Sequence, residues 1–277
     1  MLLCGGVAGS ITKTCVAPLE RLRILAQTGA LDGYYATSRQ ILKEEGVVGF
    51  WRGNFLNCCR VFPSRGILFA SNDFAKRMYC RTTNTMASDV PFWALFASGS
   101  FAGACATITT YPLDVVRTRI TGQMRLGSRY ADMGMVSTMR VIVKEEGFRA
   151  LYRGIGPTLL GAFPYEGIKF SIFDMLKERC PDNVNPVLWR VSSGALAGIA
   201  AGLVMFPNDT VRRLLQMQGQ GGQERVYSSA IDCWKKNIRE HGFLRLYRGI
   251  APYLIRMVPN AAIQFTIYEE LKRLAGE

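Results

Sequence analysis

Long apolar stretches recur along the chain, and each is long enough to cross a lipid bilayer as a helix. Residues 93–113 are 21 positions without a charged side chain, and residues 187–207 contain only one, Arg190. A further apolar stretch runs from Leu2 to Leu19. A helix rises about 1.5 Å per residue, so a helix of this length spans the ~30 Å hydrocarbon core of a bilayer. The pattern predicts an all-α membrane protein.

The mean hydropathy is low for a chain with such stretches. It is +0.09, and 49% of the residues are hydrophobic. Helices that face lipid on one side and a water-filled cavity on the other must keep one face polar. We therefore expect the helices to surround a polar cavity.

A six-residue pattern occurs three times at nearly equal intervals. Each copy is a proline, an acidic residue two positions later and an arginine three positions after that, and the copies occupy residues 18–23, 112–117 and 207–212. The prolines lie 94 and 95 residues apart. Such a fixed spacing indicates tandem repeats, which we place at residues 1–84, 85–181 and 182–277.

Each repeat shares two further elements. The first is a glycine and, five positions later, the sequence aromatic-arginine-glycine, as in Glu45-Gly46 and then Trp51-Arg52-Gly53. The second is an acid with a lysine three positions later: Asp73 with Lys76, Asp174 with Lys177, and Glu269 with Lys272. Between the elements we expect short amphipathic helices at residues 35–45, 130–146 and 227–240, and even-numbered long helices at residues 54–77, 155–178 and 250–273.

These three elements in threefold register resemble the mitochondrial carrier family over nearly the whole chain. The resemblance implies six transmembrane helices and short matrix helices in a pseudo-threefold barrel. It also implies a multi-pass protein of the mitochondrial inner membrane, with both termini toward the intermembrane space. Only 17 residues precede Pro18, fewer than the other repeats have before their prolines, so we expect the start of the chain to be shortened.

The charge and composition exclude several function classes. The net charge is +13, yet no long basic run and no nucleic-acid-binding module is present, which favours an anionic substrate and anionic lipid such as cardiolipin over nucleic acid. The eight cysteines show no Cys-x-x-Cys spacing and are expected to be reduced. One histidine and no paired-carboxylate or Ser/His arrangement argue against an enzyme. We expect no metal, no cofactor and a monomer.

The charges beyond each proline would be costly in lipid, so they should face inward and pair. The resemblance implies that they close the matrix side as a ring, with glutamines bracing it from below. The predicted pairs are Glu20–Arg117, Asp114–Arg212 and Asp209–Arg23, and the braces are Gln27 and Gln216. It also implies a cytosolic gate made by Asp73, Lys76, Asp174, Lys177, Glu269 and Lys272, in which Tyr268 provides the one hydroxyl brace.

Positions that differ between the repeats should select the substrate. The seventh residue after each aromatic-arginine-glycine element is Arg60, Gly161 or Arg256, and in the family these are substrate contact points. The two guanidinium groups suit phosphate, and Lys13 faces the same cavity by helical register. Gly161 and Ala162, with Tyr165 one turn further, resemble the adenine pocket of nucleotide-type carriers.

The residues around Lys13 and the Arg60-Val61-Phe62-Pro63 run resemble the coenzyme A and adenine nucleotide (ATP-Mg/phosphate-like) branch. We therefore predict exchange of coenzyme A or an adenine nucleotide by alternating access. Two alternatives stay open: a carrier of another anion such as thiamine pyrophosphate or a carboxylate, and a carrier-fold scaffold that does not transport. Glu166 either pairs with Lys169 or Arg65, or serves proton coupling or a cationic part of the substrate.

Overall fold

The computed structural model describes residues 2–28, 33–83, 91–123, 130, 133–179, 186–219, 225–257, 259–260 and 263. Its long helices are α1 (Leu2–Thr28), α3 (Asn54–Thr83), α4 (Phe92–Thr121), α6 (Ile155–Lys177) and α7 (Pro186–Met217). Residues 250–257 are also helical, and most of the remainder of the helix expected at residues 250–273 lies outside the described residues. The short helices are α2 (Tyr34–Glu45), α5 (Met135–Glu146) and α8 (Ala230–His241). No strand occurs in these ranges, so the all-α prediction is confirmed.

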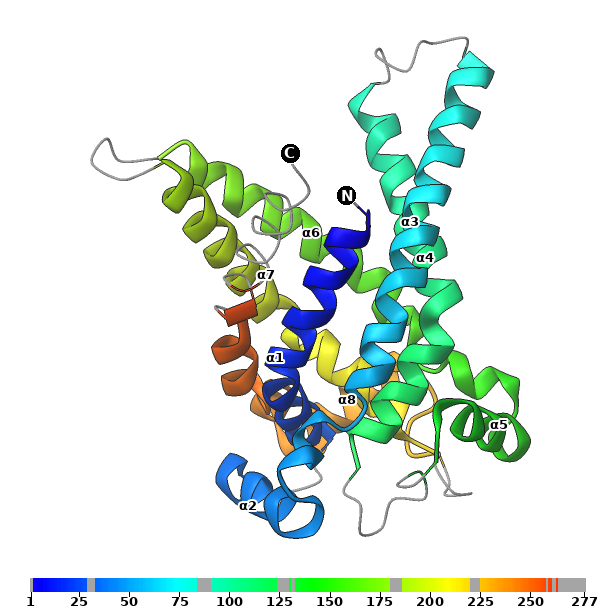
Figure 1. Ribbon diagram of the computed structural model, residues 1–277, viewed down its shortest axis with the longest axis vertical. Coiled ribbons are helices and arrows are strands. Elements are labelled where there is room, and N and C mark those ends of the chain that lie inside the picture. The colour runs from blue at the N-terminus through cyan, green and yellow to red at the C-terminus, as the bar shows by residue number, and fades with distance from the viewer. Residues whose placement is uncertain are drawn as a thin grey trace.

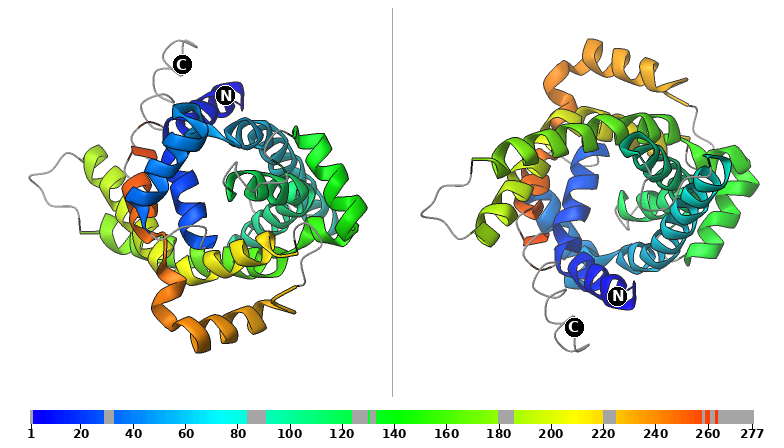
Figure 2. Two further views of the ribbon diagram at one scale, coloured as in Figure 1. Left: turned by 90° about the horizontal axis from the view of Figure 1, so that it is seen from below. Right: turned by 90° about the horizontal axis from the view of Figure 1, so that it is seen from above.

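The long helices form a ring about a common axis, as the end-on views of Figure 2 show. In Figure 1 the short helices α2, α5 and α8 lie together at the lower end of that ring. Within each of the first two repeats, the odd helix, the short helix and the even helix follow in that order, and the third repeat begins in the same way. The result is the pseudo-threefold arrangement expected from the repeats.

The boundaries of the short helices differ from the prediction in two places. The second begins at Met135 rather than at Tyr130, because Gly134 precedes it in an extended conformation and Tyr130 lies in a turn with its ring buried. The third begins at Ala230, because the side chain of Ser229 accepts a hydrogen bond from the Asp232 backbone N–H. Such a cap satisfies a donor that the first helical turn leaves free.

A 3₁₀ helix that the sequence pattern did not indicate follows each short helix. These are η1 (Val47–Trp51), η2 (Phe148–Tyr152) and η4 (Phe243–Tyr247). Each short helix with its 3₁₀ helix packs against the lower half of the odd helix in its own repeat. In the third repeat, for example, Cys233 and Leu246 are fully buried against Val211 and Leu215 of α7.

The glycine after each 3₁₀ helix packs against the odd helix of the next repeat around the ring. Gly53, Gly154 and Gly249 all have positive φ, at 79°, 82° and 96°, a conformation that favours glycine. A Cβ on Gly154 would lie 3.0 Å from the Arg212 carbonyl oxygen of α7, and one on Gly249 would lie 3.0 Å from that of Arg23 in α1. These close contacts join the three repeats at the lower end.

Hydropathy alone identifies little of this arrangement. Within the described part of the chain, residues 192–217 of α7 are the one segment that is both long and apolar enough to be recognised as a membrane span. The other long helices carry charged or polar residues that face the middle of the ring, as the next section shows. This agrees with the low mean hydropathy of the chain.

Candidate functional site

Three carboxylate–arginine pairs form a ring where the odd helices converge. Arg117 Nη2 lies 3.5 Å from Glu20 Oε1, and Arg23 Nη2 lies 2.7 Å from Asp209 Oδ2. Arg212 pairs with Asp114. Each pair joins two neighbouring odd helices, so the structure brings together all three predicted partners. The prolines 18, 112 and 207 lie inside α1, α4 and α7, directly before these charges.

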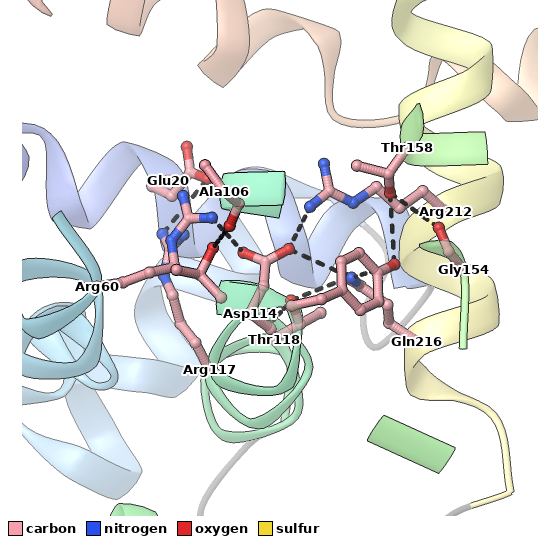
Figure 3. Close-up of polar contacts among 12 residues, drawn as sticks. Glu20, Arg60, Ala106, Asp114, Arg117, Thr118, Gly154, Thr158, Arg212 and Gln216 are labelled. Carbon is pink, nitrogen blue, oxygen red and sulfur yellow. Dashed lines mark hydrogen bonds and ion pairs between the residues drawn. The ribbon is translucent and has the colours of Figure 1, made fainter. Parts of the chain in front are cut away.

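The two glutamines beneath the ring make different contacts. Gln216 donates to Asp114 Oδ2 at 3.3 Å and to the Tyr111 hydroxyl at 3.0 Å, and Figure 3 shows it beside that carboxylate. Gln27 instead donates to Thr210 Oγ1 at 3.2 Å. Gln216 therefore contacts a ring carboxylate directly, whereas the contact seen for Gln27 is to the residue next to Asp209.

Two predicted substrate residues reach the same carboxylates. Arg60 of α3 places Nη1 3.6 Å from Asp114 Oδ1, and Arg256 places Nε 3.2 Å from Glu20 Oε2. Figure 3 shows Arg60 and Arg212 approaching Asp114 from opposite sides. Each of these contact-point arginines thus faces the carboxylate of the next repeat around the ring.

The third carboxylate has no such arginine. The position equivalent to Arg60 and Arg256 is Gly161 in the second repeat, and it faces Asp209 of the third. The Asp209 side chain is 41% exposed, against 12% for Glu20 and 2% for Asp114. A side chain missing at Gly161 therefore leaves this carboxylate open.

A pocket of about 180 Å³ occupies the space beside Asp209. We call it the α6–α7 pocket. Its lining residues are Gly161, Ala162, Tyr165, Glu166, Gly202, Met205, Asn208, Asp209 and Tyr253. Three of them were predicted to form a base-binding surface: Gly161, Ala162 and Tyr165. Typical ligand pockets hold ~300–1,000 Å³, so this one is sized for part of a substrate.

The walls of the pocket depend on two glycines of different helices. A Cβ on Gly202 of α7 would overlap the Tyr253 ring and hydroxyl, and a Cβ on Gly161 would overlap the Asn208 amide. Arg23 stacks over Tyr253, with its guanidinium carbon 4.4 Å from the ring centroid. The Arg23–Asp209 pair is thus held against an aromatic wall of the pocket.

Basic side chains also gather around the Glu20 carboxylate of the ring. Lys13 lies close enough to Glu20, Arg60, Arg117 and Arg256 to interact with all four electrostatically. Three cationic side chains, at Lys13, Arg60 and Arg256, therefore lie together as predicted for an anion site. The α6–α7 pocket itself is lined by the carboxylates of Glu166 and Asp209, which pair with Lys169 and Arg23.

Glu166 lies beside Lys169, which places Nζ 3.2 Å from Glu166 Oε2. The two side chains are 48% and 38% exposed. This contact agrees with the pairing alternative for Glu166, although the carboxylate also lines the α6–α7 pocket.

The predicted cytosolic gate is not assembled within the described residues. Asp73, Asp174 and Lys177 are exposed and Lys76 is partly exposed, and among these four no ion pair forms. The remaining members, Tyr268, Glu269 and Lys272, lie outside the described residues. The end of the ring away from the short helices is therefore open at these positions, while the other end is closed by ion pairs.

Two buried charge clusters were missed at the level of sequence. Glu45 accepts hydrogen bonds from Arg21 at 2.7 and 2.8 Å, and Glu146 pairs with Arg119 and Arg153. Both glutamates belong to the glutamate–glycine element of their repeats. Arg21 lies three positions after its proline and Arg119 seven, so the partners share no repeat position. The available signal was a second arginine near each proline, Arg21 beside Arg23 and Arg119 beside Arg117, that the threefold pattern does not explain.

The repeats and the sequence comparisons agree on the family. Residues 1–83, 88–184 and 183–277 each match the pattern described as mitochondrial carrier protein. The chain belongs to the mitochondrial carrier family. These carriers are inner-membrane transport proteins rather than enzymes. Among the described residues no group of three or more His, Cys, Asp or Glu gathers to hold a metal ion.

Individual carriers match the chain over nearly its full length. A mitochondrial adenine nucleotide transporter of Arabidopsis thaliana, ADNT1, is 34% identical, covering 99% of this chain and 86% of that protein. The carrier CoAc1 of the same plant is 35% identical, covering 98% and 88%. ADP/ATP translocase 3 of Bos taurus is 34% identical, covering 98% and 96%.

Proposed function

We propose that this carrier exchanges coenzyme A or an adenine nucleotide across the mitochondrial inner membrane by alternating access. The observation that carries the proposal is the contact of Arg60 with Asp114 and of Arg256 with Glu20. The printed names of three similar carriers, an adenine nucleotide transporter, CoAc1 and an ADP/ATP translocase, support the substrate class.

The arginine contacts link substrate binding to the closed end of the ring. A phosphate group bound by Arg60 and Arg256 competes with the carboxylates for the same guanidinium groups. Each carboxylate then loses one of two cationic neighbours, and the remaining pair holds the helices together less strongly. Substrate can shift the equilibrium between two states only by binding one of them more tightly. Here that preference would come from arginines released as the ring opens.

The polarity of the site supports one orientation of the substrate. Phosphates would lie on the cationic side with Lys13, Arg60 and Arg256. Among the described residues no arginine or lysine lines the α6–α7 pocket, and the two cations beside it, Arg23 and Lys169, are already paired with its two carboxylates. The uncharged base of an adenine-containing substrate is the part that would enter the pocket. Coenzyme A and adenine nucleotides share this combination of phosphates and adenine.

The proposal also assigns the two ends of the ring. The ion-pair ring beside the short helices would be the matrix gate, so the open end and the termini would face the intermembrane space. Asp73, Lys76, Asp174 and Lys177 would form part of the second gate in the opposite state. We expect a monomer without a cofactor, surrounded by anionic lipid such as cardiolipin that its basic surface attracts.

Reconstitution into liposomes tests the proposal. Vesicles loaded with unlabelled coenzyme A, ATP or thiamine pyrophosphate are given each compound in labelled form outside. We expect uptake of coenzyme A or ATP that depends on the internal pool. Arg60→Ala and Arg256→Ala should each reduce this exchange by at least about a hundredfold, because each removes a charged phosphate ligand.

A matched control separates the site from general effects of charge removal. Arg81 is an exposed arginine in the last turn of the same helix as Arg60, and Arg81→Ala should exchange at the wild-type rate. Unchanged exchange in both Arg60→Ala and Arg256→Ala would refute the site. Uptake of thiamine pyrophosphate alone would refute the substrate class and leave the transport function intact.

A further inference from the structure

Asn208 breaks the threefold pattern inside the α6–α7 pocket. It lies between the proline and the acid of the third repeat, where the first two repeats have Leu19 and Leu113. An amide in the middle of a membrane helix is costly unless its polar atoms are used. We therefore expect the amide of Asn208 to have hydrogen-bonding partners that a leucine at this position could not serve.

The amide nitrogen of Asn208 is held by the neighbouring helix. Its Nδ2 donates a hydrogen bond to the Pro157 carbonyl oxygen of α6 at 2.8 Å. A carbonyl can only accept, so this contact decides which end of the amide is nitrogen and which is oxygen. Gly161 makes the approach possible, because a Cβ there would overlap Nδ2. The side chain is thus held in one orientation by two features of α6.

The same contact leaves Oδ1 as an acceptor. No described residue donates a hydrogen bond to it, and it is not among the buried side-chain atoms that lack a partner. Asn208 lines the pocket, where Oδ1 can be reached by a ligand. One of the two Nδ2 hydrogens is also left over, since an amide nitrogen carries two donors and Pro157 uses one.

Other polar groups of the pocket point to the same ligand chemistry. The carboxylates of Glu166 and Asp209 accept hydrogen bonds and donate none when ionised. Tyr165, which is partly exposed, adds aromatic surface on which a planar ring can pack. An occupant with an exocyclic amino group matches these acceptors, whereas an occupant with a carbonyl at that place would set acceptor against acceptor.

We propose that Asn208 is the residue that selects the base, by accepting a hydrogen bond from the exocyclic amino group of a 6-aminopurine at the α6–α7 pocket. The inference rests on the proposed function, because it concerns the base end of the same substrate. Asparagine pairs well with adenine in general, since its oxygen accepts from N6 and its nitrogen donates to N7. A 6-oxopurine presents an acceptor at position 6 and loses this bond.

A base-exchange assay in proteoliposomes tests the assignment. Uptake of labelled ADP is competed with unlabelled ADP or with IDP, which differs in its 6-oxopurine base. Wild type should prefer ADP by about tenfold or more, the effect of one hydrogen bond and the unpaired acceptor left without it. Asn208→Leu, which restores the leucine of the other repeats, should bring the ratio close to one while keeping measurable uptake.

Two further variants make the result specific. Leu113→Asn places the same amide at the equivalent position of the second repeat, away from the pocket, and should keep the wild-type ratio. The side chain of Asn208→Ser is shorter, so this variant should also lose the preference for ADP over IDP. It provides the test if the leucine variant does not fold. If Asn208 only joins α7 to α6, its substitution should lower the stability of the protein and leave the ADP-to-IDP ratio unchanged.

The possible failures can be told apart. If wild type carries ADP and Asn208→Leu keeps its preference over IDP, the assignment of Asn208 is wrong and the proposed function stands. If wild type takes up coenzyme A but no ADP, the same competition is run with coenzyme A and its hypoxanthine analogue, with the same criterion. If wild type carries no adenine compound, both proposals are overturned.

Discussion

Arg60 of α3 lies 3.6 Å from the same Asp114 carboxylate that Arg212 of α7 binds. One carboxylate on α4 therefore holds three helices together at the centre of the ring. Its side chain is 2% exposed, so its charge depends on these two arginines. This is the point at which a bound anion would act on the closed state.

Replacing that carboxylate should weaken the closed ring. Asp114→Asn leaves two partly buried arginines without their acceptor. Removing one partner of a fully buried pair costs about 3–5 kcal/mol of unfolding free energy, which is the upper bound here. We expect a lower thermal midpoint in detergent and loss of exchange in liposomes. Asp174→Asn removes an exposed carboxylate of α6 and should change the midpoint little. Equal midpoints for the two variants would contradict this account.

Filling the α6–α7 pocket should discriminate between substrate classes. Ala162→Trp adds a large ring to a lining position and leaves Arg60 and Arg256 in place. Uptake of an adenine compound should fall at least about a hundredfold, because the base loses its site. A small carboxylate that binds the arginines alone would still be carried. The measurement is uptake of both kinds of compound by one preparation, and an unaffected adenine substrate would show that the base lies elsewhere.

The buried glutamates near the short helices should stabilise the fold more than their counterpart in the third repeat. Glu146 is 4% exposed and pairs with two arginines. The equivalent residue is His241, which is 53% exposed. Glu146→Gln should lower the unfolding free energy by about 3–5 kcal/mol, and His241→Gln by less than about 0.5 kcal/mol. Thermal unfolding of both variants checks the difference, which would vanish if the clusters contributed nothing.

A glycine that joins two repeats should not tolerate a side chain. Gly154 has φ 82° and lies against the Arg212 carbonyl oxygen and the Tyr111 hydroxyl. Gly154→Ala should destabilise the protein by about 1–3 kcal/mol through backbone strain and crowding. Gly156→Ala, two positions on and with open space around it, should be neutral or slightly stabilising. The comparison is again made by thermal unfolding, and a neutral Gly154→Ala would rule out the tight contact.

The packing of α8 should suppress the reactivity of its cysteine. Burial raises the pKa of the Cys233 thiol to about 12, so almost no thiolate exists at pH 8. With Cys233 as the only cysteine, alkylation at pH 8 should be more than about a hundredfold slower than for Ile231→Cys on the exposed face of α8. The rate for Cys233 should keep rising with pH beyond 10. Rapid labelling of native protein at pH 8 would contradict the burial of α8.

The sequence by itself determined the repeats and the positions of the described long helices, and it indicated that the charges beyond the prolines face inward and pair. Which of these charges pair was implied by the resemblance to the carrier family. The repeats and the inward-facing charges could be recognised because the three repeats place prolines and charges at equal spacing, and because a charge in a membrane helix must find a partner. The short helices were also recognisable, although their first residues depend on local caps such as Ser229. Repetition, more than hydropathy, carried this information.

Only the tertiary structure showed how the repeats differ in space. The contact of Arg60 with Asp114 joins residues of different repeats, and no periodic pattern within one helix reports such a contact. The same holds for Arg21 and Arg119, which reach equivalent glutamates from different helix positions. The pocket exists because Gly161 leaves Asp209 without a second arginine, and Asn208 gains its orientation from Pro157 across the helix interface. The site depends on side chains that extend from one helix to contact another, and only the tertiary structure shows which of them meet.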